Sequence, residues 1–365
     1  MGPIRIAVVG AGAFGRNHLR VYRELEAAHP ELVQLAALVD ESAATRDEAA
    51  ARYGIPAFGS VAELLAAGLK LDAASVCVPT VHHASVAELL LTAGLDVLIE
   101  KPFAASLAEA DSVLALANSL GRIVQIGHLE RFNPAVTAVA ERLNNPMFFE
   151  AHRLSIFTPR SLDVDVVLDL MIHDLDVVLS LTNSPVREVR AVGLAVLSRK
   201  VDIANVRVEF DSGCVANFTA SRVSTEQVRK VRLFQPHQYL SLDFARQELL
   251  SIDVDPAAAA AFLSRPSPPA AALADASGAA LQHPSAGLNL QKFDLTRAEP
   301  LRLELEDFLR AIRTRTAPRV TGEAGRAALS LALEINREIK EHAQRAGLDQ
   351  ETANRKQETG NRTSS

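Results

Sequence analysis

The chain has 365 residues, and its hydrophobic fraction of 48% and charged fraction of 22% are typical of a soluble globular protein. Its formal net charge of −6 argues against general nucleic-acid binding, and no apolar stretch approaches the ~20 residues of a membrane span. At about 150 residues per domain, the length predicts two domains. No basic leader precedes an apolar run, so we expect a cytoplasmic protein.

A glycine-rich turn follows the first expected strand. Residues 4–9 form an apolar run typical of a buried strand, and residues 16–28 carry apolar side chains at helical spacing. The segment between them is expected to bind a dinucleotide through Gly10, Gly12, Ala13, Phe14 and Gly15. Gly10 permits a tight turn, Gly12 lets the backbone approach a pyrophosphate, and Gly15 lets the helix pack on the strand. The pyrophosphate would lie on the exposed amides at the start of the helix.

A second expected strand, residues 35–39, ends in an acid. Asp40 lies 25 residues after Gly15, slightly beyond the usual ~20-residue spacing of the acid that binds the ribose hydroxyls. Because an acid repels a 2′-phosphate, Asp40 favours NAD over NADP, although the nearby Arg46 tempers that preference.

Helices and strands then alternate along the chain. We expect helices at residues 61–67, 84–93 and 107–120, and strands at residues 73–78, 97–99 and 123–127. This alternation predicts an α/β fold with an N-terminal Rossmann domain, a doubly wound parallel sheet, over residues 1–126. Lys101 leaves the sheet at the carboxyl end of the strand expected at residues 97–99, the edge where such sheets bind ligands. It is therefore either a surface cation or a catalytic group.

After residue 127 most of the intervening helices disappear. Expected strands lie at residues 148–156, 186–197, 204–210, 214–220, 231–234 and 239–244. They predict a C-terminal α+β domain, residues 127–320, with an open, mainly antiparallel sheet that often forms an oligomer interface. We interpret residues 255–290 as a flexible insertion, residues 321–346 as a helix packing back on the Rossmann domain, and residues 349–365 as a disordered tail. Residues 301–314 form a further amphipathic helix.

A buried helix over residues 163–181 carries several ionisable groups. Asp169, His173 and Asp176 stand at i, i+4 and i+7 and so share one face. Burying three such groups is costly unless they are paired or line a polar cavity. Asp174 lies well round the helix, where we expect a structural pairing with an arginine.

Four features together resemble the Gfo/Idh/MocA oxidoreductases: the glycine turn, the loop at residues 80–83, the Glu100-Lys101-Pro102 motif, and Asp169 four residues before His173. The resemblance runs from residue 4 to about residue 345, without residues 255–290. It implies NAD-dependent oxidation of a sugar or cyclitol hydroxyl, and its implied catalytic residues are Lys101, Asp169 and His173. It also places Pro79, Thr80, His83, Glu100 and Lys101 at the cofactor.

The resemblance implies a different chemical role for each of the three catalytic residues. His173 would take the hydroxyl proton, because histidine ordinarily titrates near neutrality, and Asp169 would orient the imidazole. Lys101 would hydrogen-bond the reacting oxygen as negative charge develops on it. Whether Lys101 or His173 is the immediate base stays open at this point.

Residues 127–134, 169–174, 231–234 and 239–244 resemble, more narrowly, the family members that oxidise the C3 hydroxyl of UDP-N-acetylglucosamine, so that an aminotransferase can install an amine for lipid A. This implies a nucleotide-sugar substrate, and the expected contacts are His128, Arg131, Asn133, Arg160 and Asp176. Four arginines are candidates for the diphosphate: Arg131, Arg153, Arg160 and Arg222. Arginine binds phosphate through two hydrogen bonds, and we favour Arg131 among the four.

Partners and alternatives complete the expectation. We expect a homo-oligomer (a dimer or tetramer), a functional aminotransferase partner, no nucleic-acid or membrane partner, and no metal, since His128 and His152 have no companions at ligand spacing. A related dehydrogenase of another sugar, a UDP-sugar uronate or a cyclitol is the main alternative. A non-catalytic NAD-binding regulator is a second, against which the intact Lys101, Asp169 and His173 argue.

Overall fold

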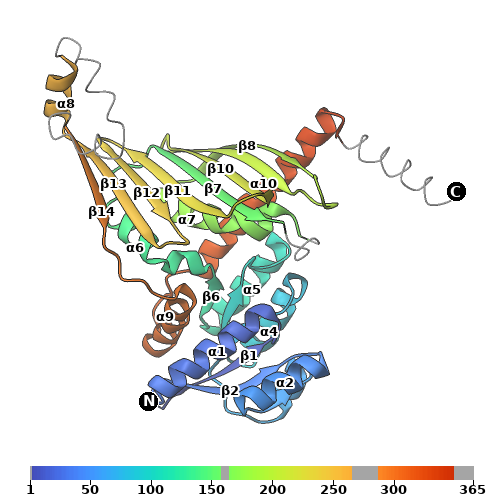
Figure 1. The fold of residues 1–365 in the computed structure, drawn as a ribbon. Coiled ribbons are helices and arrows are strands. Elements are labelled where there is room, and N and C mark those ends of the chain that lie inside the picture. Colours follow the sequence, from blue (N-terminus) through green and yellow to red (C-terminus); the bar gives the residue numbers. More distant parts are fainter. Residues whose placement is uncertain (1, 158–163, 265–286, 349–365) are drawn as a thin grey trace. The chain divides into compact units, whose positions relative to one another are not determined.

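The computed structural model describes residues 2–157, 164–264 and 287–348. The chain divides into two compact units, each built from two separate stretches (Figure 1). Unit 1 comprises residues 1–133 and 298–330, and unit 2 comprises residues 134–297 and 331–365. The first division therefore falls after Asn133, a few residues beyond the expected boundary at residue 126.

Unit 1 contains a six-stranded parallel sheet in the order β3-β2-β1-β4-β5-β6, which confirms the predicted Rossmann topology. Its strands are β1 (Ile4–Val9), β2 (Val33–Val39), β3 (Ala57–Phe58), β4 (Ala73–Val76), β5 (Asp96–Glu100) and β6 (Val124–Gly127). Its helices are α1 (Ala13–Ala28), α2 (Ala43–Tyr53), α3 (Val61–Ala66), α4 (His83–Thr92), α5 (Leu107–Leu120) and α9 (Pro300–Thr314), with short 3₁₀ turns η1 (Thr80–His82) and η2 (Leu129–Phe132). The strand order reverses between β1 and β4, which places a ligand site at their carboxyl ends.

Local signals explain where these helices begin and end. The Ser106 hydroxyl caps α5 by accepting a hydrogen bond from the Glu109 amide, and the Glu109 carboxylate in turn accepts one from the Ala105 amide, just before the cap. Gly121 then ends α5 in the left-handed conformation. Helix α9, which the sequence assigned to the second domain, instead packs its apolar face into the core formed by β1, β2 and α1.

Unit 2 contains an eight-stranded sheet in the order β14-β13-β12-β11-β7-β10-β9-β8, in which only the β7–β10 pair is parallel. The strands are β7 (Phe148–Ile156), β8 (Val186–Leu194), β9 (Ile203–Phe210), β10 (Val215–Ser224), β11 (Val228–Gln235), β12 (Gln238–Asp243), β13 (Glu248–Val254) and β14 (Leu288–Phe293). The described helices are α6 (Pro134–Ala140), a π-helical segment η3 (Val167–Met171), α7 (Ile172–Thr182) and α8 (Pro256–Leu263). This confirms the predicted open, mainly antiparallel sheet.

The prediction of a flexible insertion at residues 255–290 is wrong at both ends of that range. Helix α8 occupies its beginning, because five consecutive alanines have high helix propensity. Its end forms the start of β14, which pairs antiparallel with β13. Residues 265–286, and the expected tail at residues 349–365, lie outside the described residues.

Helix α10 (Gly322–Arg345) is divided between the units. In unit 1 a Cβ on Gly325 would lie 2.4 Å from Cγ1 of Ile126, so the helix starts in tight contact with β6. In unit 2 the Asn336 side chain donates to the Asp165 carboxylate at 3.1 Å. We expected the whole helix to pack on the Rossmann domain, but the part of α10 from Leu331 onward belongs to unit 2. Among the described residues, every helix is too short or too polar to span a bilayer.

Candidate active site

The glycine turn in unit 1 has the geometry that dinucleotide binding requires. Gly10 has φ +93°, and a Cβ there would lie 2.6 Å from the Cys77 carbonyl oxygen. A Cβ on Gly15 would lie 1.8 Å from the Gly10 carbonyl oxygen, so glycine is needed for the helix to approach the strand. Gly12 stands at the start of α1 and has open space within 4 Å of its Cβ position. These features fit a pyrophosphate resting on the exposed backbone of α1.

Asp40 connects the end of β2 to this turn. Its carboxylate accepts hydrogen bonds from the Ala11 amide at 2.7 Å and the Ser42 amide at 2.9 Å. The Arg46 guanidinium contacts the Asp40 backbone, donating to its carbonyl at 3.2 Å. The acid therefore lies directly beside the glycine turn.

The remaining expected cofactor residues occupy the carboxyl edge of the sheet. Ala13, Phe14 and Pro79 are exposed, whereas Thr80 in the loop after β4 and Lys101 immediately after β5 are half-buried. The Lys101–Pro102 peptide bond is cis. The edge thus presents a backbone cradle after β1, a carboxylate after β2 and a half-buried lysine after β5 of one sheet.

Two of the expected cofactor residues point into the protein. His83 is 1% exposed, and its Nδ1 and Nε2 atoms lie 2.9 Å from the carbonyl oxygens of Pro102 and Val78. Burial lowers the pKa of His83, and the two carbonyls offset this only in part. Glu100 is 5% exposed, and its Oε1 lies 2.8 Å from Nε2 of the fully buried His18 in α1. His18 was not among the residues predicted from the sequence.

In unit 2, the helix expected over residues 163–181 is two different segments. Asp169 lies in the π-helical η3, and His173 lies in the first turn of α7. A π-helical turn holds more residues than an α-helical turn, so the simple i, i+4 argument for a shared face does not carry across the junction. Short π-helical segments are nevertheless frequent at functional sites.

A buried ion pair fixes α7 on the sheet. The Arg153 guanidinium in β7 donates to both oxygens of Asp174, from Nε at 2.9 Å and from Nη2 at 2.7 Å. The same guanidinium lies 5.3 Å from the centre of the Phe244 ring. This confirms the expected arginine partner of Asp174, and it places Arg153 in a structural contact rather than at a phosphate.

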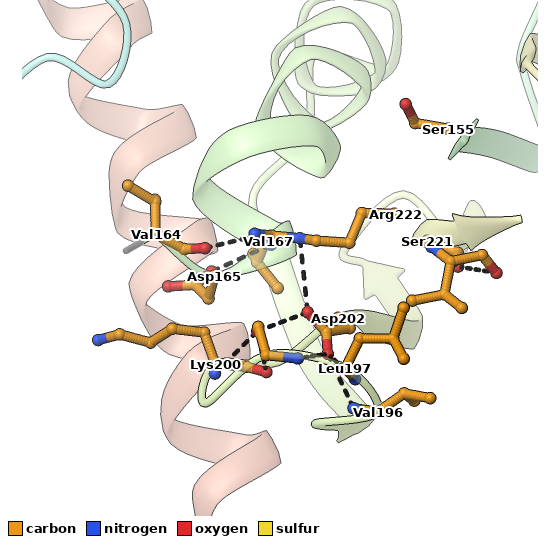
Figure 2. Close-up of polar contacts among 12 residues, drawn as sticks. Ser155, Val164, Asp165, Val167, Val196, Leu197, Lys200, Asp202, Ser221 and Arg222 are labelled. Atoms are coloured by element: carbon orange, nitrogen blue, oxygen red, sulfur yellow. Dashed lines mark hydrogen bonds and ion pairs between the residues drawn. The ribbon is translucent and has the colours of Figure 1, made fainter. Parts of the chain in front are cut away.

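A second polar cluster anchors the start of η3 (Figure 2). The Arg222 guanidinium donates to the Val164 carbonyl at 2.6 Å, and its Nε lies 3.8 Å from Asp202. The Asp165 carboxylate accepts from the amides of Val167 and Leu168, both at 3.0 Å, which caps the segment. Arg222 is 5% exposed, so it too serves the fold instead of a diphosphate.

Asp202 is the anion at the centre of this cluster. One of its oxygens accepts hydrogen bonds from the amides of Val196, Leu197 and Ser198 at 2.7–2.8 Å. Burial acts to raise the pKa of Asp202, but these bonds and the Ser198 hydroxyl outweigh it and hold the pKa below its usual range. The carboxylate is therefore ionised at neutral pH and balances Arg222.

The expected substrate residues divide between the units. His128 and Asn133 flank η2 in unit 1 and are each 1% exposed, and Arg131 lies within η2 and is half-buried. The Asn133 amide donates to Glu130 at 3.3 Å. Asp176 is buried in α7, and Arg160 lies outside the described residues. In the described part of the chain, no three His, Cys, Asp or Glu residues are grouped as metal ligands would be.

Comparisons with known proteins agree with this architecture. Residues 4–128 match the model of an oxidoreductase family with an NAD-binding Rossmann fold, and residues 135–234 match the GFO/IDH/MocA C-terminal domain. The UDP-N-acetylglucosamine 3-dehydrogenase of Acidithiobacillus ferrooxidans is 36% identical over 343 residues, which cover 94% of this chain and 99% of that protein. Its solved structure superposes with a TM-score of 0.80, covering 93% of this chain and 98% of the other.

More distant relatives share the fold. The inositol 2-dehydrogenase of Leifsonia xyli is 32% identical over 194 residues, covering 51% of this chain and 56% of that protein. The structure of the WlbA dehydrogenase from Bordetella pertussis, in complex with NADH and UDP-GlcNAcA, is 17% identical with a TM-score of 0.72, covering 93% of this chain and 97% of the other. That second likeness concerns the fold alone.

Proposed function

Because this chain belongs to the Gfo/Idh/MocA family of NAD-dependent oxidoreductases, we propose that it oxidises the C3 hydroxyl of UDP-N-acetylglucosamine to the 3-keto sugar. One observation carries the choice of substrate: the similarity to the UDP-N-acetylglucosamine 3-dehydrogenase extends over 94% of the chain at 36% identity. The likeness to the inositol dehydrogenase covers only about half of the chain.

The residues of unit 1 fit the cofactor. NAD, when bound, supplies the hydride acceptor for the reaction. The backbone from Gly10 to Gly15 would hold its pyrophosphate, and Asp40 would receive the ribose hydroxyls. The Asp40 carboxylate stands beside the Ala11 amide, so a 2′-phosphate at this position would meet a negative charge. This supports NAD over NADP.

Three side chains would carry the proton chemistry. His173 would accept the proton of the sugar hydroxyl, and Asp169 would orient the imidazole and balance its charge. The Lys101 ammonium would hydrogen-bond the reacting oxygen and stabilise the developing alkoxide. The position of Lys101 at the carboxyl end of β5, and the π-helical placement of Asp169, support these roles.

The decisive experiment measures NADH formation with UDP-N-acetylglucosamine. Glutamate and a 3-keto-sugar aminotransferase would be added to remove the ketone, and mass spectrometry of the aminated product would locate the oxidised carbon. Matched reactions would use UDP-N-acetylglucosamine uronate, UDP-glucose, free N-acetylglucosamine and inositol. Turnover of the uronate or of inositol, with none of UDP-N-acetylglucosamine, would contradict the proposal.

We also propose that an aminotransferase consumes the keto sugar, as in amide-linked lipid A synthesis, and that the protein is a homo-oligomer. Apolar side chains that are exposed among the described residues on one face of the unit 2 sheet support the second point. They include Val192 and Leu194 at 42% and 44% exposure, and Phe234 in an aromatic cluster with Phe148 and Tyr239. Light scattering at micromolar concentration would test this, and a monomeric mass would contradict it.

A further inference from the structure

His18 is a buried ionisable residue to which the proposed chemistry gives no role. It lies on the inner face of α1, fully buried, and its Nε2 is 2.8 Å from Oε1 of Glu100. Glu100 is the last residue of β5, and the next residue is Lys101. A buried carboxylate needs a hydrogen-bonding partner, and α1 supplies one from the neighbouring layer. The contact therefore connects the helix of the glycine turn to the strand that presents the lysine.

The other side of the Glu100 carboxylate is confined by Gly127. Gly127 pairs with Glu100 between β5 and β6. A Cβ on Gly127 would lie 2.9 Å from both Cδ and Oε1 of Glu100, closer than a real Cβ tolerates. Glycine at this position thus leaves the space that the carboxylate fills, and the carboxylate is held between α1 and β6.

The residue on the other side of Lys101 is held as well. The Pro102 carbonyl oxygen lies 2.9 Å from Nδ1 of His83, whose Nε2 lies 2.9 Å from the Val78 carbonyl oxygen. The His83 ring therefore lies between the loop after β4 and the turn after β5, in contact with both. Both chain neighbours of Lys101 contact a buried imidazole, one through a side chain and one through the backbone.

We infer that His18 is a positioning residue for Lys101, acting through the Glu100 carboxylate held over Gly127, with His83 bracing the following residue. The inference rests on the proposed function in one respect: Lys101 is taken to act on the substrate oxygen. Gly12 is also the N-cap of α1, where the backbone would meet the cofactor pyrophosphate under the proposed function. One helix therefore sets both the cofactor site and the direction of the lysine, and a small shift of a catalytic group is enough to lower a rate strongly.

The test combines amine reactivity with kinetics. Wild-type protein and four variants would be acetylated briefly over a range of pH, and mass spectrometry would give the labelling rate of Lys101 relative to the exposed Lys70 in the same molecule. H18L removes the hydrogen bond, H18Q keeps a donor, and G127A displaces the carboxylate from the opposite side. H29Q, at the exposed end of the same helix, is the matched control.

We expect H18L and G127A to change the Lys101 to Lys70 labelling ratio at least threefold and to lower kcat at least tenfold, with KM for NAD within threefold of wild type. H18Q should stay within threefold of wild type in both measurements, and H29Q should not differ. In a K101M background, H18L should lower kcat little further, because a residue that acts only by positioning Lys101 has no effect once Lys101 is absent.

Two results would overturn the inference. One is an unchanged labelling ratio in folded H18L and G127A. The other is a loss of kcat in H18L that is equally large with and without Lys101. If H18L fails to fold, the labelling ratio and kcat of G127A are compared with those of H18Q instead, and an unchanged labelling ratio in G127A would overturn the inference. Absence of turnover in the wild type, together with the expected labelling shifts, would refute the proposed substrate and support the positioning of Lys101.

Discussion

The Arg153–Asp174 pair should be one of the strongest single determinants of stability in unit 2. Its two hydrogen bonds measure 2.7 Å and 2.9 Å, and the side chains are only 4% and 3% exposed. D174A would leave the guanidinium buried without its counter-charge, which costs roughly 3–5 kcal/mol. For a unit of this size, each kcal/mol shifts Tm by about 2–4 °C, so we expect a decrease of about 6–20 °C.

Differential scanning calorimetry would measure this decrease in the transition assigned to unit 2. Asp211 is the matched control, because its pair with Arg187 is 53–60% exposed and D211A should change stability by less than about 0.5 kcal/mol. An R153L/D174L double variant should recover most of the loss, since an apolar pair leaves no buried charge. A D174A protein within about 1 kcal/mol of wild type, or a double variant as unstable as the single one, would refute the reasoning.

Three further predictions concern the cofactor, the chemistry and pH. G12A should melt at the wild-type temperature without cofactor, because the added Cβ meets nothing within 4 Å. It should bind NAD roughly tenfold or more weakly in calorimetric titration, because the methyl group would occupy the space where the pyrophosphate approaches the backbone. Unchanged affinity for NAD would count against the pyrophosphate site. K101M should lower kcat by roughly 10²–10⁴-fold while NAD still binds, and normal turnover would exclude Lys101 from the chemistry. The pKa of Asp202 is lower in the folded state than in the unfolded state. Asp202 therefore stabilises the fold at pH values above its unfolded-state pKa of about 3.9, and this stabilisation is lost as the pH falls through the folded-state pKa. In urea titrations, wild type should therefore lose more stability below about pH 4 than D202N, and parallel pH profiles would contradict this.

The Rossmann unit was predictable because its signals are local and strong. The glycine turn, the apolar strands and the helix at residues 107–120 each follow from residues close together in sequence, and all are present in the structure. Helix α2 lacks an apolar stripe, since Ala49 is its only buried residue, and it was not predicted. Helix α9, by contrast, was predicted from its amphipathic pattern. That pattern does not specify which unit the apolar face packs against, and the helix was assigned to the wrong one.

The site was predictable in its residue types and less so in its geometry. The position of Lys101 follows from a strand end, and a structural partner for Asp174 followed from its place on the helix. The π-helical turn at Asp169 was not foreseen, because a period of 3.6 residues is assumed when a helix is read from sequence. His18 looks like any core histidine on an apolar helix face. Its partner Glu100 is 82 residues away, a contact that one sequence cannot reveal.

The discontinuous construction of unit 1 bears on how the chain is synthesised. Leu301, Leu305 and Phe308 of α9 complete the core formed by β1, β2 and α1. Domains generally fold in order as they leave the ribosome, N-terminal first. Here the first 133 residues emerge without those side chains, and the whole polypeptide of the unit 2 sheet is made before α9 appears. The nascent Rossmann segment therefore emerges with part of its core incomplete, and the cofactor-binding unit is completed only after the unit 2 sheet has been synthesised.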